Sequence, residues 1–567
     1  MRHKVVKKLL LTAVAGLVLP LSAHAADEDL QQKIDKLSKQ VDELTGQVKR
    51  TESKSLGKWL TIGGDYRFRI DSLHGKTEAY TDVMGTFANA QQQLQGAFFA
   101  DPTGTSPFFG PATNGAALTA LMQFSQNMSL VKTYQDAVNF PAGFSGGFPN
   151  SALMGGIGGF AKQVPAYKPQ NETLYTNKFG LDLHAKATQD VTVNVKLDMY
   201  KVFGSQDATP ALGNYFADRI GVFDGTLSHV PSDSLLNVDR AYATWSNIAD
   251  QPVWFSVGRR PSTNGAPSNL RLNNERPGNG GTPALLVDYA FDGMTIGWAP
   301  DIESLPGAYA KVCYGRGFDS GIKTATNSIK DTDMLGVAVI PVDTDPLRVW
   351  LQWNRGFNIF DAPVMANSAF GPTAPSTNLG DIDWYGAGAM STLKNVGPGN
   401  LNFFSDFGVS ITHPNDNVSA NFGFMGLGTG QFFAPEAPTS KTGWAVYTGV
   451  RYDLPSKTKI GFEFNHGSKD WITFAPSADD MWTSKVGTRG NVYEPYIIQE
   501  LNLKPISSYL SKAFFRLGYQ YYDFEYTGSN NWVGAPMKIS DVTQNTMLLL
   551  APLKEAHDVY ATFEVHF

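Results

Sequence analysis

The chain has 567 residues, of which 17% are charged, with a formal net charge of −6, 56 glycines and one cysteine. A single cysteine excludes an internal disulfide, and this small charge without a basic cluster argues against a nucleic-acid partner. The mean hydropathy is −0.20 and no apolar run of about 20 residues follows the N-terminus, which excludes a bundle of membrane-spanning helices. A soluble globule or a transmembrane β-barrel remains.

Residues 1–25 have the pattern of a secretory signal peptide. Basic residues precede an apolar run over residues 9–21, and Ala23 and Ala25 supply the small side chains of a cleavage site before Ala26. The apolar run is too short for a spanning helix, so we expect export with cleavage rather than a membrane anchor. Because the residue directly after the cleavage site is not a cysteine, the mature chain is not expected to be a lipoprotein.

Residues 26–56 are expected to form a periplasmic coiled-coil helix and a linker. Apolar residues alternate at intervals of four and three, with Ile34, Val41 and Val48 at the a positions and Leu30, Leu37 and Leu44 at the d positions. This choice of side chains favours two parallel strands. Since a short helix is marginal in water without a partner, we predict homo-oligomerisation through residues 30–48. The alternative is a monomeric amphipathic helix that lies on the rest of the protein.

From residue 57 to residue 567 the apolar period changes to two, which indicates β-strands. Residues 178–199 show two alternating arms joined by a turn at 188–190, and each arm is long enough to cross a bilayer. Strands of soluble sandwiches average about 5–6 residues, shorter than the alternating segments here. Trp, Tyr and Phe gather near the strand ends, as in the aromatic girdles of membrane barrels. The predicted fold is therefore all-β, a transmembrane antiparallel β-barrel with a short N-terminal coiled-coil helix.

Connection lengths predict the number of strands. Short connections such as 188–190 and 455–459 alternate with long ones such as 413–441, as they do between the two ends of outer-membrane barrels. Asp292-Gly293 could form a hairpin, but a bulge inside one long strand keeps the alternation and gives about 16 strands, with 14 or 18 as alternatives.

The first long loop, residues 72–173, carries apolar residues at helical spacing and is expected to be partly helical. It could fold back and narrow the bore. It could equally form an external cap over the mouth of the barrel.

Charged residues alternate with apolar ones along the predicted strands, as in "GGDYRFRIDS" at residues 63–72. An arginine facing lipid near the bilayer midplane would cost about 2–4 kcal/mol, so the charged face must be directed into a wet interior. Cys313 is expected on the same face. The residues predicted to line the pore are Asp65, Arg67, Arg69, Lys178, Asp182, His184, Lys186, Lys196, Asp198, Arg240, Arg260, Lys311, Arg348, Asp406, Arg451, Glu463 and Arg516.

The predicted lining is basic in the early strands and balanced or slightly acidic in the later ones. Opposed walls of this kind would favour zwitterionic or small anionic solutes. Alternatively, the charges pair locally across strands and only solvate the lumen, which leaves the selectivity unassigned.

Signals of catalysis and of metal binding are weak. No HExxH, P-loop or CxxCH motif occurs, and the nine histidines are not at metal-ligand spacing. We therefore expect no enzyme activity, no catalytic residue, no metal and no cofactor. A catalytic pair assembled across strands is the alternative.

Several segments together resemble a known family. They are "WLTIGGDYRFRID", "VDRAYATW", "FSVGRRP", "YGRGFDSG" and the terminal "VYATFEVHF". With the signal peptide and the heptad helix, they resemble an uncharacterised family of Gram-negative outer-membrane porin-like barrels. The chain is more loosely similar to trimeric porins with an N-terminal periplasmic coiled coil, from which its very long first loop departs. Trimer state and selectivity therefore do not carry over.

The resemblance implies a multi-pass protein of the Gram-negative outer membrane, in contact with its lipid bilayer. It also implies that the barrel-assembly machinery recognises the C-terminal Phe567. The expected function is a porin-like channel for passive diffusion of small hydrophilic solutes. The alternatives are a barrel that sheathes a partner electron-transfer cytochrome, and a surface receptor or adhesin that uses the first loop.

Overall fold

The computed structural model describes residues 59–204, 236–260, 266–275, 285–287, 290–325, 328–363, 365–368, 371–475, 480–504 and 511–567. The predicted signal peptide and heptad helix lie outside the described residues. Within these ranges, none of the helices has the length and apolar character needed to cross a membrane.

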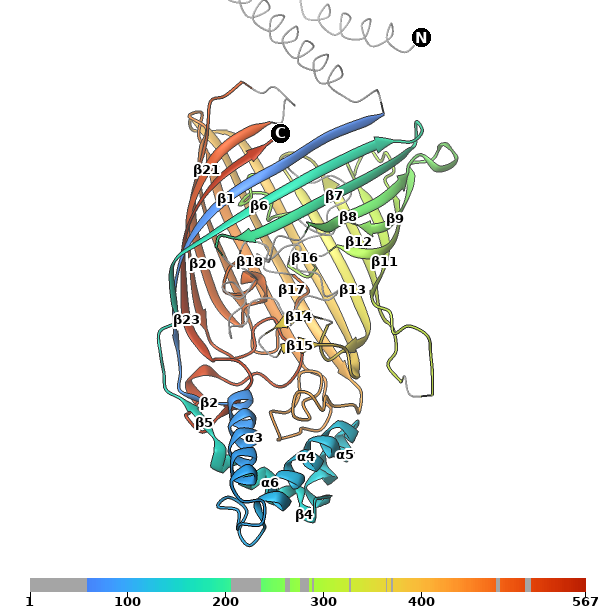
Figure 1. The fold of residues 1–567 in the computed structure, drawn as a ribbon. Helices are drawn as coiled ribbons and strands as arrows, with labels where there is room; N and C mark the ends of the chain where they lie inside the picture. The colour runs from blue at the N-terminus through green and yellow to red at the C-terminus, as the bar shows by residue number, and fades with distance from the viewer. Residues whose placement is uncertain are drawn as a thin grey trace, which may run out of the picture.

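The described chain forms a closed antiparallel barrel of 16 strands, as predicted (Figure 1). Each strand pairs with the next barrel strand along the chain, and the first pairs with the last. The strands are β1 (Leu60–Thr77), β6 (Gln170–Lys186), β7 (Val191–Val202), β8 (Leu236–Trp245), β9 (Val253–Arg260), β10 (Phe291–Trp298), β11 (Tyr309–Phe318), β12 (Thr332–Asp343), β13 (Arg348–Phe360), β16 (Asn378–Val396), β17 (Gly399–Pro414), β18 (Thr442–Asp453), β19 (Thr458–Gly467), β20 (Gly490–Glu500), β21 (Lys512–Phe524) and β23 (Leu553–His566).

The two ends of the barrel differ in the length of their connections, as expected. Short turns lie at one end, here named the turn end, where β1 begins and β23 ends (Figure 1). Long connections lie at the opposite end, the loop end. The first of them covers residues 78–169 rather than 72–173, because β1 stays paired with β23 up to Thr77 and β6 begins at Gln170.

The Asp292-Gly293 dipeptide is not a hairpin. Asp292 lies within β10 and is paired with Arg259 on one side and Arg316 on the other, without a register shift. The predicted long bulged strand is nevertheless wrong, because β10 begins only at Phe291. Residues 285–287 leave the wall and are buried inside the barrel. The strand count holds, since the described residues between β9 and β10 add no strand to the barrel.

The outer face of the barrel is an apolar band bordered by charge. Outward side chains along the middle of the strands are exposed and apolar, namely Tyr66, Val193, Val257, Ile296, Val312, Val339, Leu351, Phe407, Val450, Phe462, Ile497, Leu517 and Val559. Toward the loop end this band gives way to ion pairs on the same outward face, Arg259–Asp292 at 3.2 Å, Arg316–Asp333 at 2.8 Å and Arg355–Asp383 at 3.0 Å.

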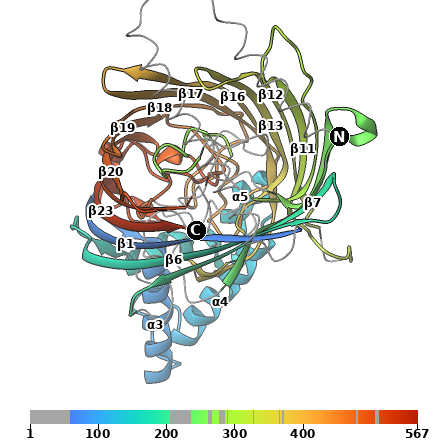
Figure 2. The same ribbon diagram turned by 90° about the horizontal axis from the view of Figure 1, so that it is seen from above.

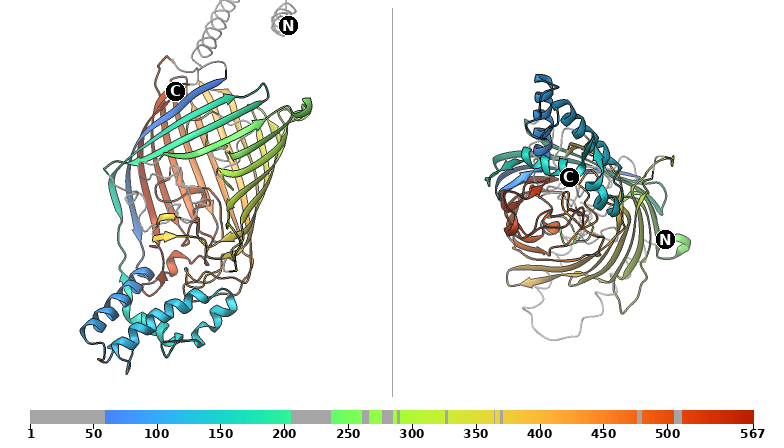
Figure 3. Two further views of the ribbon diagram at one scale, coloured as in Figure 1. Left: turned by 45° about the vertical axis from the view of Figure 1, so that its right-hand side comes forward. Right: turned by 90° about the horizontal axis from the view of Figure 1, so that it is seen from below.

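The first long connection folds into a helical cap beyond the loop end (Figures 1 and 3). It contains α3 (Val83–Ala100), α4 (Asn114–Leu130), α5 (Tyr134–Asn139) and α6 (Asn150–Ile157), with the short strands β2 (Tyr80–Asp82), β3 (Phe144–Ser145), β4 (Phe148–Pro149) and β5 (Lys162–Val164). Beside it, β22 (Met547–Leu548) joins β2, and β14 (Met365–Ser368) pairs with β15 (Gly371–Thr373).

Aromatic contacts attach this cap to the β17–β18 connection. The ring of Phe140 lies 4.9 Å from that of Phe424, and the ring of Phe124 lies 6.0 Å from that of Phe433. Of the two alternatives for the first loop, the structure therefore has the external cap.

Candidate functional site

Segments from two long connections fold into the bore. They are residues 266–275 and 285–287 between β9 and β10, and residues 468–475 and 480–489 between β19 and β20, and together they are named the plug here. Figure 2 shows segments of the chain inside the ring of barrel strands. The plug packs in one apolar cluster with inward aromatic side chains of the wall. The bore is therefore filled by a folded core over much of its length.

The inner face of the wall and the plug are complementary in shape. Trp384 of β16 donates from its indole nitrogen to the carbonyl of Ile472 at 2.8 Å, and its ring lies 4.7 Å from that of Phe474. A Cβ at Gly408 would lie 2.7 Å from Leu286, so the glycine makes room for the plug. These contacts replace the polar lining that alternation alone predicts for the inward face.

The segment 266–275 forms a compact run of turns that contacts wall residues in the half of the bore toward the turn end. The Arg451 guanidinium donates to the carbonyl of Leu270 at 2.6 Å, and the Arg516 guanidinium donates to the carbonyl of Arg271 at 3.0 Å. Farther along, the ammonium of Lys459, near the start of β19, donates to Asn273 at 2.6 Å. Three charged wall residues thus bind the backbone or side chains of this segment.

Buried ion pairs hold the plug against the wall formed by β19 and β20. Arg271 lies 3.5 Å from Glu494 of β20 and 2.9 Å from Asp480 of the other plug segment, and its side chain is 6% exposed. Lys485 lies 2.6 Å from Glu494 and also pairs with Glu463. The plug therefore supplies the cations that compensate two buried wall carboxylates, which would be costly if left alone.

All the residues predicted to line the pore lie on the inward faces of their strands, but many are buried. Those covered to 8% exposure or less are Arg67, Arg69, Lys196, Asp198, Arg260, Lys311, Arg348, Asp406, Arg451, Glu463 and Arg516. Those with greater exposure are Asp65, Lys178, Asp182, His184, Lys186 and Arg240. The more exposed set belongs to β1, β6 and β8, so the covering is uneven around the barrel.

Several of the predicted charges pair locally across strands. Lys196 lies 2.5 Å from Asp65 and 3.3 Å from Asp182, and Lys178 lies 3.2 Å from Asp198. These ion pairs agree with the alternative to opposed charged walls, in which inward charges pair locally across strands.

Other predicted residues have different partners. Arg69 pairs with Asp71 at 2.6 Å and with Asp558 at 2.9 Å, Arg240 with Asp239 at 3.1 Å, and Arg516 with Glu564 at 3.0 Å. Arg67 and Arg348 donate to the hydroxyls of Tyr200 and Tyr309, His184 bonds to Asn194, and Asp406 accepts from the indole of Trp350 at 3.1 Å.

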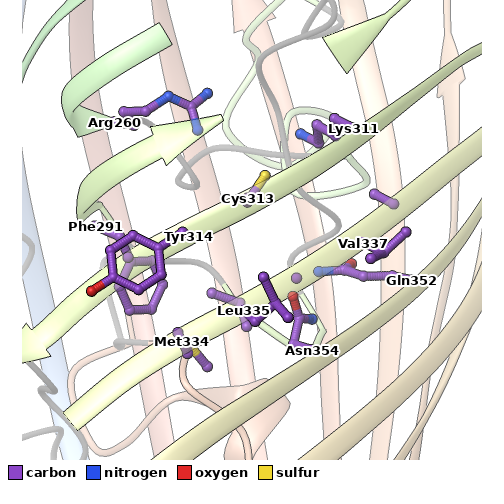
Figure 4. A pocket seen from close by; sticks show the side chains of 14 residues that line it. Arg260, Phe291, Lys311, Cys313, Tyr314, Met334, Leu335, Val337, Gln352 and Asn354 are labelled. Atoms are coloured by element: carbon purple, nitrogen blue, oxygen red, sulfur yellow. The ribbon is translucent and has the colours of Figure 1, made fainter. Parts of the chain in front are cut away.

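A pocket lies against the inner face of the wall formed by β9–β13 (Figure 4) and is named the chamber here. Its inward polar side chains are Arg260 from β9, Lys311 and Cys313 from β11, and Gln352 and Asn354 from β13. The described residues that line the chamber include two cations and no carboxylate. Cys313 faces the interior, as predicted.

One sequence pattern typical of hydrolases occurs in the cap. Residues 143–147 read Gly-Phe-Ser-Gly-Gly, which has the spacing of a nucleophile elbow. Ser145 is buried in the cap, where its hydroxyl donates to Asn150 and accepts from Asn127. Among the described residues, no histidine bonds to it. Those residues also contain no group of three or more His, Cys, Asp or Glu side chains that could hold a metal ion.

A comparison with protein families finds one match. Residues 168–567 match the model of a family described as a protein of unknown function, DUF3373. No curated protein matches the chain.

Solved structures with similarity to the chain are bacterial outer-membrane proteins and porins. OprB of Pseudomonas putida, at high pH, aligns with a TM-score of 0.40 and 8% identity over 90% of this chain and 94% of that chain. OmpT, an outer membrane protein of Vibrio cholerae in its trimer form, aligns with a TM-score of 0.36 and 10% identity over 90% and 100%. A mutant of the Rh. blastica porin aligns with a TM-score of 0.34 and 9% identity over 89% and 99%. The strand pairing described above, rather than these similarities, establishes the barrel.

Proposed function

We propose that this chain, which belongs to the DUF3373 family of proteins of unknown function, is an outer-membrane porin-like channel for small hydrophilic solutes, narrowed by its own plug. A closed barrel leaves no unpaired strand edge, and its outer band of apolar side chains is suited to lipid. Under this proposal the turn end faces the periplasm, and the loop end with its helical cap faces outward. The proposal includes no catalytic step.

One observation carries the proposal: the interior is covered unevenly. Inward charges on β6 and β8 keep contact with water, since the side chain of Asp182 is 50% exposed and that of Arg240 is 21% exposed. On the opposite wall the side chains of Glu463 and Glu494 are each 1% exposed. We infer that solutes follow a path along β6–β13, past the plug, rather than the axis of an open tube.

Planar-bilayer recording tests this function with the full mature chain. A wide 16-strand bore would conduct as an open aqueous channel. We expect small, stable steps instead, and uptake into proteoliposomes of small sugars but not of large ones. A barrel that inserts fully, as judged by protease protection of its strands, and yet never conducts or admits solute would refute the proposal.

The packed bore bears on the cytochrome-sheath alternative. Trp384, Trp471 and Trp532 are buried side by side with plug segments where a partner protein would have to pass. A sheath would therefore require the whole core to leave the barrel. A receptor role for the cap is compatible with the channel, because the cap lies outside the bore.

Two further partners belong to the same proposal. Phe567 exchanges backbone hydrogen bonds with Gly64 at 2.9 Å in both directions, and a Cβ at Gly64 would lie 2.9 Å from the Phe567 ring. The terminal residue thus packs across the seam between the first and last strands, a position suited to recognition by the assembly machinery. Homo-oligomerisation through residues 30–48 is proposed on the heptad pattern alone.

A further inference from the structure

The chamber between β9 and β13 contains two cations contributed by different strands. Arg260 is buried, and its guanidinium donates to the hydroxyls of Ser256 and Thr295. It forms no ion pair with a described residue. Lys311, two strands away on β11, also lies on the chamber wall and is 3% exposed. An arginine that is hydrogen-bonded only to hydroxyls keeps its charge available for an anion, which a guanidinium binds with its fork of donors.

Two amide groups in the chamber have polar atoms without a partner. Gln352 and Asn354 are 7% and 8% exposed, and the Gln352 Oε1 and Asn354 Nδ2 atoms make no hydrogen bond in the structure. Figure 4 shows both side chains beside the cavity, below Lys311 and Cys313. A buried polar atom without a partner costs about 1–3 kcal/mol, which a ligand that bonds to it would recover. One of these atoms requires an acceptor and the other a donor.

Small residues create the space between these groups. Gly315, Gly336 and Ala338 line the chamber on β11 and β12, and a Cβ at Gly336 would lie 2.4 Å from the Asn354 amide oxygen. Larger inward side chains at these positions would fill the cavity.

We propose that the chamber is a binding site for a small organic carboxylate that also carries a hydroxyl group. Arg260 and Lys311 hold the carboxylate, the Asn354 amide donates to it, and the Gln352 carbonyl accepts from the hydroxyl. This inference rests on the proposed channel function and names the class of solute that the channel prefers.

Cys313 provides a probe that requires no mutation, because it lines the chamber and is the only cysteine of the chain. The labelling rate of the detergent-solubilised barrel is measured with an anionic and a cationic methanethiosulfonate of similar size. We expect the anionic reagent to react about tenfold faster, and the difference to shrink at high salt. Equal rates, or faster labelling by the cationic reagent, would overturn the proposal.

Protection from labelling tests the ligand class. Lactate should slow the labelling of Cys313 more than propionate, which lacks the hydroxyl, and choline should not protect. Equal protection by lactate and propionate would refute the role of Gln352, and the absence of protection would refute the site. Labelling does not depend on conduction, so this test can fail while the channel function stands, and the reverse also holds.

Substitutions distinguish the effect of the chamber cations on labelling from the effect of positive charge elsewhere in the lumen. R260Q and K311Q should each reduce the ratio of anionic to cationic labelling, and in bilayers they should reduce the preference for lactate over potassium. K186Q removes the same charge from an exposed inward position at the turn end of β6, outside the chamber, and should leave the labelling ratio near wild type. An effect of K186Q as large as that of R260Q would overturn the assignment to the chamber.

Discussion

Replacing Arg271 with glutamine tests whether the plug is held by charge. The side chain lies between Asp480 and Glu494, is 6% exposed, and belongs to a segment that is otherwise held by hydrogen bonds to wall residues. Removing it leaves Glu463 and Glu494 with Lys485 as their remaining plug cation, and Asp480 with hydrogen bonds from the Lys485 backbone N–H and the Gln520 amide. Breaking a buried ion pair by removal of one partner costs about 3–5 kcal/mol.

That free energy applies to docking of the plug rather than to formation of the barrel, because the strands stay paired when the segment leaves. The equilibrium between docked and undocked plug should shift by about 10² to 10³-fold or more. Amide hydrogens of residues 266–275 should then exchange faster by a comparable factor, while those of β20 change little. Single-channel recordings of R271Q should show larger or fluctuating conductance.

The matched control is K394Q. Lys394 pairs with Asp345 at 2.7 Å at the turn end, but both side chains are more than 60% exposed, so the pair contributes at most about 1 kcal/mol. Exchange and conductance should equal those of the wild type. If R271Q matched K394Q in both measurements, the buried ion pairs would not hold the plug, and the apolar packing would have to do so alone.

Three further substitutions probe other parts of the fold. G408V should displace Leu286 and destabilise plug docking by about 1–3 kcal/mol, seen as faster exchange in residues 285–287, and unchanged exchange would contradict the packing described. V559R should destabilise the barrel in lipid vesicles by up to about 2–4 kcal/mol in denaturant unfolding, and V559L should not, if this face meets lipid. Hydrogen bonds from Thr133 lower the pKa of Asp136 in the α5 capping box, so its stabilising effect is complete above the unfolded pKa and is lost as pH falls through the folded pKa. Amide exchange in α5 should therefore speed up in acid, and D136N should reproduce this at neutral pH, by less than about tenfold.

The wall of the barrel could be predicted from sequence because its signal is local and repeated. Alternation over residues 178–199 places Phe179 outward and Lys178 inward, and β6 and β7 pair in that register, with Lys178 opposite Tyr200. A slip of one residue would turn every charge toward lipid, so the energy that selects the register is large at each strand. The alternation of short and long connections predicts the strand count. That count is correct although the sequence predicts a longer β10 than the structure has.

The plug could not be predicted in the same way. Residues 266–275 have no helical or strand period in their apolar residues. The contacts of Arg271 depend on the path of this segment through the barrel, because its partner Asp480 is distant in sequence. The sequence does carry one signal of the plug: Trp350 and Trp384 occupy inward positions of their strands, where a water-filled pore would carry polar residues. Large apolar side chains at inward positions indicate that something apolar covers them.

Glycine placement completes that signal and links the plug to the chamber. On β16 and β17, Gly386 and Gly408 stand inward where Leu286 packs, so the wall there is hollowed and then filled by the chain itself. On β11 and β12, Gly315 and Gly336 hollow the wall in the same way, yet a cavity remains beside buried cations and unpartnered amides. Inward glycines thus have two different consequences in this barrel. At Gly386 and Gly408 the chain fills the space with Leu286, whereas beside Gly315 and Gly336 the space stays open next to Arg260 and Lys311 and suits a polar solute.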